Sequence, residues 1–163
     1  MITIMRRIDE LLSEYGESHQ NHTNKMIHWI CVPLIFFSIV GLISAIPSGA
    51  LQRFMGEGNP YANWATVVLV LIIIYYVSLS IFLTIGMALF SVLCLMIVNM
   101  IVQINIAPLW LVSIIIFAVA WIGQFYGHKV EGKKPSFLKD VQFLLIGPAW
   151  LMHFVYKKIG IPY

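Results

Sequence analysis

The chain has 163 residues, of which 60% are hydrophobic and only 10% are charged. Soluble domains carry roughly 25% charged residues, whereas residues 58–128 contain no Lys, Arg, Asp or Glu at all. This composition excludes a soluble globular domain and indicates an integral membrane protein. The net charge of +3 is too small to favour nucleic acid as a partner.

The polar N-terminal segment predicts a short amphipathic helix over residues 5–17. Ile8, Leu11 and Tyr15 recur at helical spacing, and charged residues occupy the other face. We expect this helix to lie along the membrane surface or to pack on the bundle. The first 24 residues lack the long apolar core of a cleaved signal peptide, so we expect the first span to be retained.

Four apolar segments, each long enough for a bilayer span of about 20 residues, predict transmembrane helices. Thr23 or Asn24 is the expected N-cap of the first of them. A fifth apolar stretch, within residues 137–156, is interrupted by Gly147-Pro148 and predicts a re-entrant or interfacial segment. The predicted spans cover residues 25–46, 61–80, 84–103 and 108–126. The expected fold is therefore an all-α membrane protein in one domain of residues 1–163, with four transmembrane helices, the N-terminal amphipathic helix and the C-terminal helical segment.

Four spans place both ends of the chain on one side of the membrane. Arg53 is then the only basic residue on the opposite side, so the positive-inside rule predicts that both termini are cytoplasmic. The expected location is a bacterial inner membrane, or the endoplasmic reticulum in a eukaryote. The nine basic residues on the cytoplasmic side are Arg6, Arg7, Lys25, Lys129, Lys133, Lys134, Lys139, Lys157 and Lys158.

The histidines suggest a metal site. An even number of crossings brings four of them to one membrane boundary, although about 100 residues separate the first three from the fourth, and the fifth joins them if the last segment does not cross. Imidazole suits Fe, Zn and Cu, but the spacing contains no HExxH and no paired CxxC motif. The alternative interpretation is that each histidine has a structural role at the membrane interface. The candidate metal ligands are His19, His22, His28, His128 and His153.

Neighbouring polar residues are candidates for supporting such a site. His19 and His22 are three residues apart and would face one side together if that stretch were helical. Asn24 lies one turn before His28, and Gln124 lies one turn before His128. Glu131, three residues after His128, is expected either to supply a carboxylate ligand or to orient a ligand ring by hydrogen bonding.

Two stretches resemble the signatures of a known family. "HQNHTNKMIHWICVP" carries His19, Asn24 and His28, and "QFYGHKVEGKKPSF" carries His128 and Glu131 followed by a basic pair. "LLIGPAWLMHFVYKKIGI" is similar to the family's closing segment. The family is that of the fungal-type 2-hydroxy fatty acid dioxygenases of the endoplasmic reticulum, together with their bacterial relatives.

The resemblance implies an Fe(II)-dependent dioxygenase of fatty acid α-oxidation. Such an enzyme shortens a long-chain 2-hydroxy fatty acid by one carbon, consuming O₂ and releasing CO₂. The family's essential histidines correspond here to His19, His28 and His128. A membrane location suits this substrate, because its tail lies in the lipid and its carboxylate at the interface, where Lys25 or the loop lysines attract it.

Two other functions remain open from the sequence. One is a non-catalytic lipid-binding or scaffold membrane protein, in which the histidines are interface residues. The other is a haem-binding membrane protein, although paired haem ligands usually lie within facing spans rather than at span ends.

Overall fold

The structure is a computed structural model that describes residues 6–132 and 137–161, with the side chains of residues 137–142 outside that description. All regular elements in the described part are helices, as the sequence predicts. Their bounds are α1 Arg7–Glu17, α2 His22–Ser44, α3 Gly49–Met55, α4 Trp64–Leu79, α5 Ile81–Ile104, α6 Leu109–Glu131 and α7 Phe137–Ile159.

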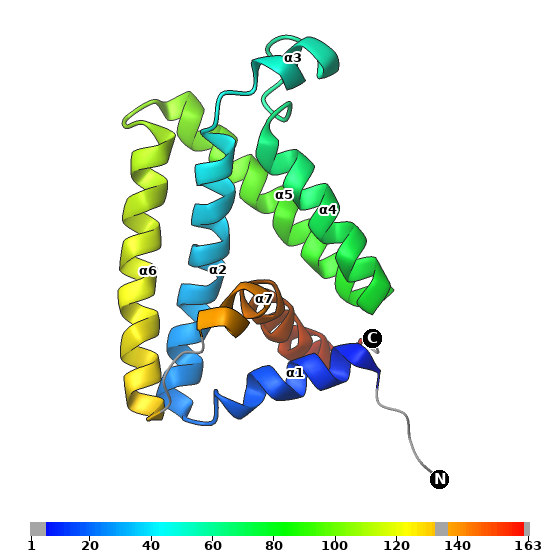
Figure 1. Cartoon of the computed structure of the whole chain (residues 1–163), viewed down its shortest axis with the longest axis vertical. Helices are drawn as coiled ribbons and strands as arrows, with labels where there is room; N and C mark the ends of the chain where they lie inside the picture. Colours follow the sequence, from blue (N-terminus) through cyan, green and yellow to red (C-terminus); the bar gives the residue numbers. More distant parts are fainter. Residues whose placement is uncertain (1–5, 133–136, 162–163) are drawn as a thin grey trace.

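Helices α2 and α6 form a closely packed antiparallel pair (Figure 1). Gly123 and Gly127, one turn apart on α6, lie where α2 passes. A Cβ added at Gly123 would lie 2.6 Å from Cys31 Sγ, and one added at Gly127 would lie 2.5 Å from Asn24 Oδ1. Small residues at such spacing let membrane helices approach closely. This pair forms one wall of the molecule.

The opposite end of the same interface depends on Gly41. A Cβ there would collide with the Ser113 hydroxyl, which donates a hydrogen bond to the Leu109 carbonyl, and would lie 3.3 Å from Ser113 Cβ. We expect Gly41→Ala to lower the free energy of unfolding by about 1–3 kcal/mol, the usual cost of overpacking, in spite of alanine's higher helix propensity. Thermal unfolding in detergent measures the change. Gly49→Ala, where no atom lies within 4 Å of the added Cβ, is the matched control, and equal effects of the two changes would contradict the packing argument.

Helices α4 and α5 form a hairpin that leaves the α2–α6 pair at an angle (Figure 1). A single extended residue, Ser80, separates them and caps α5 by accepting a hydrogen bond from Leu83 N. Asn63 caps α4 by accepting from Thr66 N. The predicted span over residues 61–80 is thus a helix of only 16 residues between two caps.

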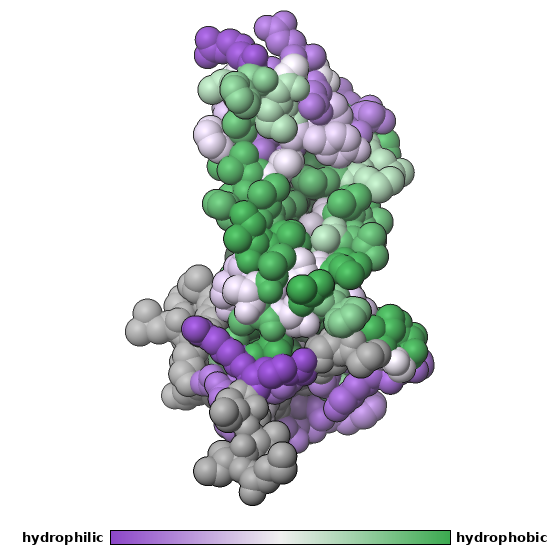
Figure 2. All heavy atoms as spheres, turned by 90° about the vertical axis from the view of Figure 1, so that its right-hand side faces the viewer, coloured by the Kyte–Doolittle hydropathy of each residue, from purple (hydrophilic) through white to green (hydrophobic). Residues whose placement is uncertain are grey.

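Three described helices, α2, α5 and α6, are long and apolar enough to cross a membrane, and α4 is a shorter apolar helix. The count of four spans therefore stays a prediction. Figure 2 shows an apolar waist between more polar ends, and Leu71 and Leu89 are among the exposed apolar side chains. A broad exposed apolar surface of this kind is suited to lipid rather than water.

Helices α1 and α7 lie across the end of the α2–α6 pair at which α2 begins and α6 ends, which we call the foot of the pair (Figure 1). The apolar face of α1, including Leu11 and Tyr15, is buried against Ile146 and Trp150 of α7, which confirms the predicted amphipathic helix from Arg7 onward. Met5, the expected first residue of that helix, lies outside the described residues.

The expected break at Gly147-Pro148 is wrong, because α7 continues through Pro148. Because proline has no N–H, Pro148 cannot donate the helical hydrogen bond to the carbonyl four residues before it, that of Leu144. In the preceding turn the Leu145 carbonyl accepts a hydrogen bond of 2.5 Å from the Tyr76 hydroxyl of α4. The re-entrant or interfacial placement of this segment stays a prediction.

Two local expectations also differ from the structure. The N-cap of α2 is Asn21 rather than Thr23 or Asn24, because its side-chain oxygen accepts hydrogen bonds from Thr23 N at 2.8 Å and Asn24 N at 3.4 Å. The predicted spans also leave residues 47–60 without a helix, whereas the structure has the short helix α3 there.

Candidate metal centre

Two histidines from distant parts of the sequence meet at the foot of the α2–α6 pair. His28 lies in the second turn of α2, and His128 lies in the last turn of α6. Because the two helices are antiparallel, the start of one lies beside the end of the other. His19, in the connection between α1 and α2, reaches the same place.

The three rings form a compact group. Ring centroids are 4.2 Å apart for His19 and His28, 5.2 Å for His28 and His128, and 5.6 Å for His19 and His128. One nitrogen of each ring lies within 4.8 Å of the others. His19 and His28 are buried, with 3% and 1% of their surface exposed, and His128 is half-buried. This spacing is suited to three imidazoles around one ion.

Backbone hydrogen bonds orient two of the rings. His19 Nδ1 donates to the Tyr15 carbonyl at 2.6 Å, and His28 Nδ1 donates to the Asn24 carbonyl at 2.9 Å. A carbonyl oxygen only accepts, so each Nδ1 carries the hydrogen and each Nε2 keeps its lone pair. Histidine ligands of metals are commonly held by such a hydrogen bond.

His19 is in the state that binds a metal. Burial lowers the pKa of His19 to about 4, although the hydrogen bond to the Tyr15 carbonyl opposes the shift. The ring is therefore neutral at neutral pH, as metal binding requires. Tyr15 stacks on it at 4.2 Å with an interplanar angle of 12°, and Trp150 lies 5.4 Å away.

Glu131 connects the two halves of the centre. Its carboxylate accepts hydrogen bonds from Gln20 N at 2.8 Å, Asn21 N at 2.9 Å and Asn24 Nδ2 at 3.0 Å. These contacts attach the segment that follows His19 to the end of α6. The carboxylate is not part of the histidine group, so of its two expected roles the geometry favours positioning.

The structure does not bring the other two histidines into the group. His22 is the first residue of α2 and is exposed. The helix that would face His19 and His22 to one side is not present, since residues 18–21 are not helical. His153 of α7 is half-buried and packs against Phe154 at 5.2 Å.

The two expected supporting amides, Asn24 and Gln124, differ in their hydrogen bonds. Asn24 is fully buried, and its side-chain nitrogen also donates to the Ser18 carbonyl at 3.3 Å. Gln124 is buried, and its Oε1 has no hydrogen-bond partner in the described part of the chain.

Sequence reasoning missed the aromatic contacts of Tyr15 and Trp150 to His19. It also missed the close approach at Gly127, for which the four-residue spacing from Gly123 was an available signal.

The residues present fit a metal ion. His19 Nε2 is buried and has no hydrogen-bond partner among the described residues, which is costly for a polar atom unless a ligand completes its coordination. Three imidazoles without a carboxylate suit Fe, Zn or Cu rather than Mg or Ca. No other group of three potential ligands occurs among the described residues.

One of three comparisons with known proteins finds a match. A family model described as 2-hydroxy-palmitic acid dioxygenase Mpo1-like matches residues 5–159. Searches of curated proteins and of solved structures give no significant match. Because the match extends over almost all of the chain, the protein belongs to the Mpo1-like family of 2-hydroxy-palmitic acid dioxygenases.

Proposed function

We propose that this protein is an Fe(II)-dependent dioxygenase that converts a long-chain 2-hydroxy fatty acid into the fatty acid one carbon shorter. The observation that carries the proposal is the close group of His19, His28 and His128 in a chain of this family. His19 and His28 are buried, and backbone hydrogen bonds leave the Nε2 lone pair of each available to an ion. These three residues would hold the ion. Iron(II), when bound, would supply the redox chemistry that activates O₂.

The proposed reaction breaks the bond between C1 and C2 of the substrate. One O₂ and one 2-hydroxy acid give the shortened carboxylic acid, CO₂ and water, which balances atoms and electrons. The protein's own groups hold the reacting end of the substrate and limit access of water. Tyr15 and Trp150 cover one side of His19 with aromatic surface, and α1 and α7 close the foot of the molecule around it.

Lys25 is our candidate for holding the substrate carboxylate. It lies in the first turn of α2, one turn before His28, and is half-buried. Its positive charge acts on His19 and contributes to the lowered pKa of that ring. A cation beside a metal site attracts an anionic headgroup. The loop lysines Lys133 and Lys134 lie outside the described residues.

We also propose that the histidine group faces the cytoplasm. Arg6, Arg7 and Lys25 belong to the end of the molecule that contains this group, whereas Arg53 lies in α3 at the opposite end (Figure 1). This distribution follows the positive-inside rule. A fatty acid in the inner leaflet would then present its carboxylate to the site while its tail stays among the helices or lipid.

The experiment that tests the proposal uses detergent-purified protein loaded with Fe(II) without oxygen. Addition of 2-hydroxyhexadecanoic acid and O₂ is expected to give pentadecanoic acid and CO₂. A chelator should abolish product formation, and Fe(II) but not Zn(II) should restore it, because zinc has no redox chemistry. Absence of product from iron-loaded protein would contradict the proposal and favour the non-catalytic lipid-binding alternative.

A further inference from the structure

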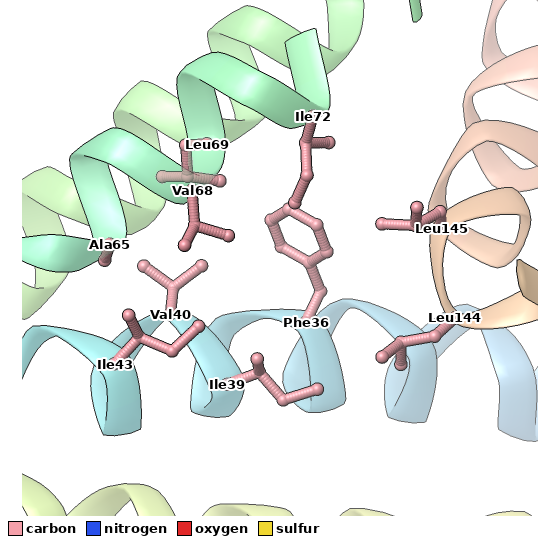
Figure 3. A pocket seen from close by; sticks show the side chains of 10 residues that line it. All are labelled: Phe36, Ile39, Val40, Ile43, Ala65, Val68, Leu69, Ile72, Leu144 and Leu145. Carbon is pink, nitrogen blue, oxygen red and sulfur yellow. The ribbon is translucent and has the colours of Figure 1, made fainter. Parts of the chain in front are cut away.

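An apolar cavity of about 60 Å³ lies between α2, α4 and α7. Figure 3 shows ten side chains around it, all of them hydrocarbon. Apolar cavities stay dry and accept apolar ligands. The cavity is therefore suited to a hydrocarbon chain and unsuited to a polar group.

The cavity lies further along α2 than His28, where α4 and α7 pack against the helix. Val32 and Phe36 follow His28 at intervals of four residues, and Phe36 lines the cavity. At 1.5 Å per residue, Phe36 lies about 12 Å along the helix from His28. A substrate bound at the histidines by its carboxyl end would thus direct its tail along α2 toward the cavity.

Helix α7 contributes side chains both to the cavity and to the surroundings of the histidine group. Its Leu144 and Leu145 line the cavity, and Trp150 lies against His19. The Tyr76 hydroxyl bonds the Leu145 carbonyl, which attaches α4 to α7 beside the cavity. Helix α7 therefore lies against the histidine group at one position and forms one wall of the cavity at another.

The cavity has a near end and a far end relative to the histidines. Phe36 and Ile72 lie beside the α7 leucines at the near end, and Ile43 and Ala65 lie at the far end (Figure 3). Ala65 is buried, with 1% of its surface exposed. A small residue at the far end leaves the space that a longer chain would occupy.

We propose that this cavity binds the hydrocarbon tail of the 2-hydroxy fatty acid and sets the preferred chain length. The inference rests on the proposed function. It assigns the tail-binding role to α2 and α4, with Ala65 at the end that limits length.

Chain-length profiles of variants test the proposal. Ala65→Phe should lower turnover of 2-hydroxyhexadecanoic acid by about tenfold or more, as expected when a pocket rejects added methylenes, and leave the ten-carbon homologue within about twofold. Ile72→Phe, at the near end, should lower turnover of both. Ile74→Phe, an exposed position on the same helix, is the control and should change neither. An Ala65→Phe profile that matches the control would overturn the proposal, provided that iron content is equal.

A labelling measurement on the unaltered protein gives an answer even if Ala65→Phe does not fold. A fatty acid carrying a diazirine near its methyl end should label residues 36–43 of α2 and 65–72 of α4 on irradiation. Excess 2-hydroxyhexadecanoic acid should suppress this labelling, and excess phospholipid should not. Suppression by phospholipid alone would show that the cavity holds bilayer lipid and would overturn the proposal. Failure of the proposed function is distinct, since unaltered protein would then turn over no 2-hydroxy acid of any length.

Discussion

Replacing His28 by alanine is expected to remove most of the bound metal and nearly all turnover. The ring is 1% exposed and its Nδ1 is already bonded to the Asn24 carbonyl, so its Nε2 is the nitrogen that is available to an ion. Loss of a residue that merely supports a ligand costs about 10–100-fold in metal affinity, and loss of a ligand itself should cost at least the upper part of that range. Metal analysis of detergent-purified protein and the rate of O₂ uptake measure the two effects. His19→Ala and His128→Ala should behave in the same way.

The control for this prediction is His22→Ala. It removes an imidazole from the same helix, but from an exposed position outside the group. Metal content and O₂ uptake should match those of the unaltered protein. If His28→Ala retained as much metal as His22→Ala, the three-histidine centre would be wrong.

The second large effect is expected from Glu131→Ala. The change removes the acceptor of three hydrogen bonds, from Gln20 N, Asn21 N and Asn24 Nδ2. The turn that carries His19 would then no longer be attached to α6, and we expect metal affinity to fall about 10–100-fold. Water can replace the carboxylate at the exposed backbone donors, so the loss in free energy of unfolding should be only about 1 kcal/mol. Metal titration with a competing chelator, combined with thermal unfolding, separates the two quantities.

Two variants sharpen this prediction. Glu57→Ala makes the same change of charge at an exposed position near α3, and metal affinity should not change. Glu131→Gln keeps an acceptor but loses the charge, so its affinity should fall between those of Glu131→Ala and the unaltered protein, because hydrogen bonds to a charged acceptor are stronger. An affinity of Glu131→Ala equal to that of Glu57→Ala would show that the carboxylate does not position the histidines.

Much of the fold follows from patterns local to the chain. The uncharged stretch of residues 58–128 predicts apolar helices because a bilayer accepts backbone only when its polar groups are paired within a helix. The burial of Leu11 and Tyr15 in α1 follows from their helical spacing. The placement of His28 and His128 at one end follows from an even number of chain passages between them, a property that counting alone supplies.

For other features, neighbouring residues offer alternative local structures, and the sequence pattern alone does not show which of them forms. Asn21 rather than Asn24 caps α2, because its side chain reaches the first free backbone N–H groups. That choice leaves residues 18–21 outside the helix, so the helical spacing that would place His22 beside His19 is absent. Similarly, Pro148 stays inside α7, where tertiary contacts such as the Tyr76 hydrogen bond surround the turn that the sequence alone marks as a break.

The sequence by itself predicted an all-helical chain with helices apolar enough to span a membrane, and its signatures identified the Mpo1-like family. It also predicted that the histidines gather at one membrane boundary. The resemblance to the family already indicated His19, His28 and His128. Only the tertiary structure showed these three rings in one group without His22 and His153, assigned Glu131 to the turn after His19, and placed an apolar cavity beyond His28. Hydropathy and spacing are properties of neighbouring residues. The distances between imidazoles instead depend on how closely α2 and α6 approach at Gly123 and Gly127, and on where α7 lies across them.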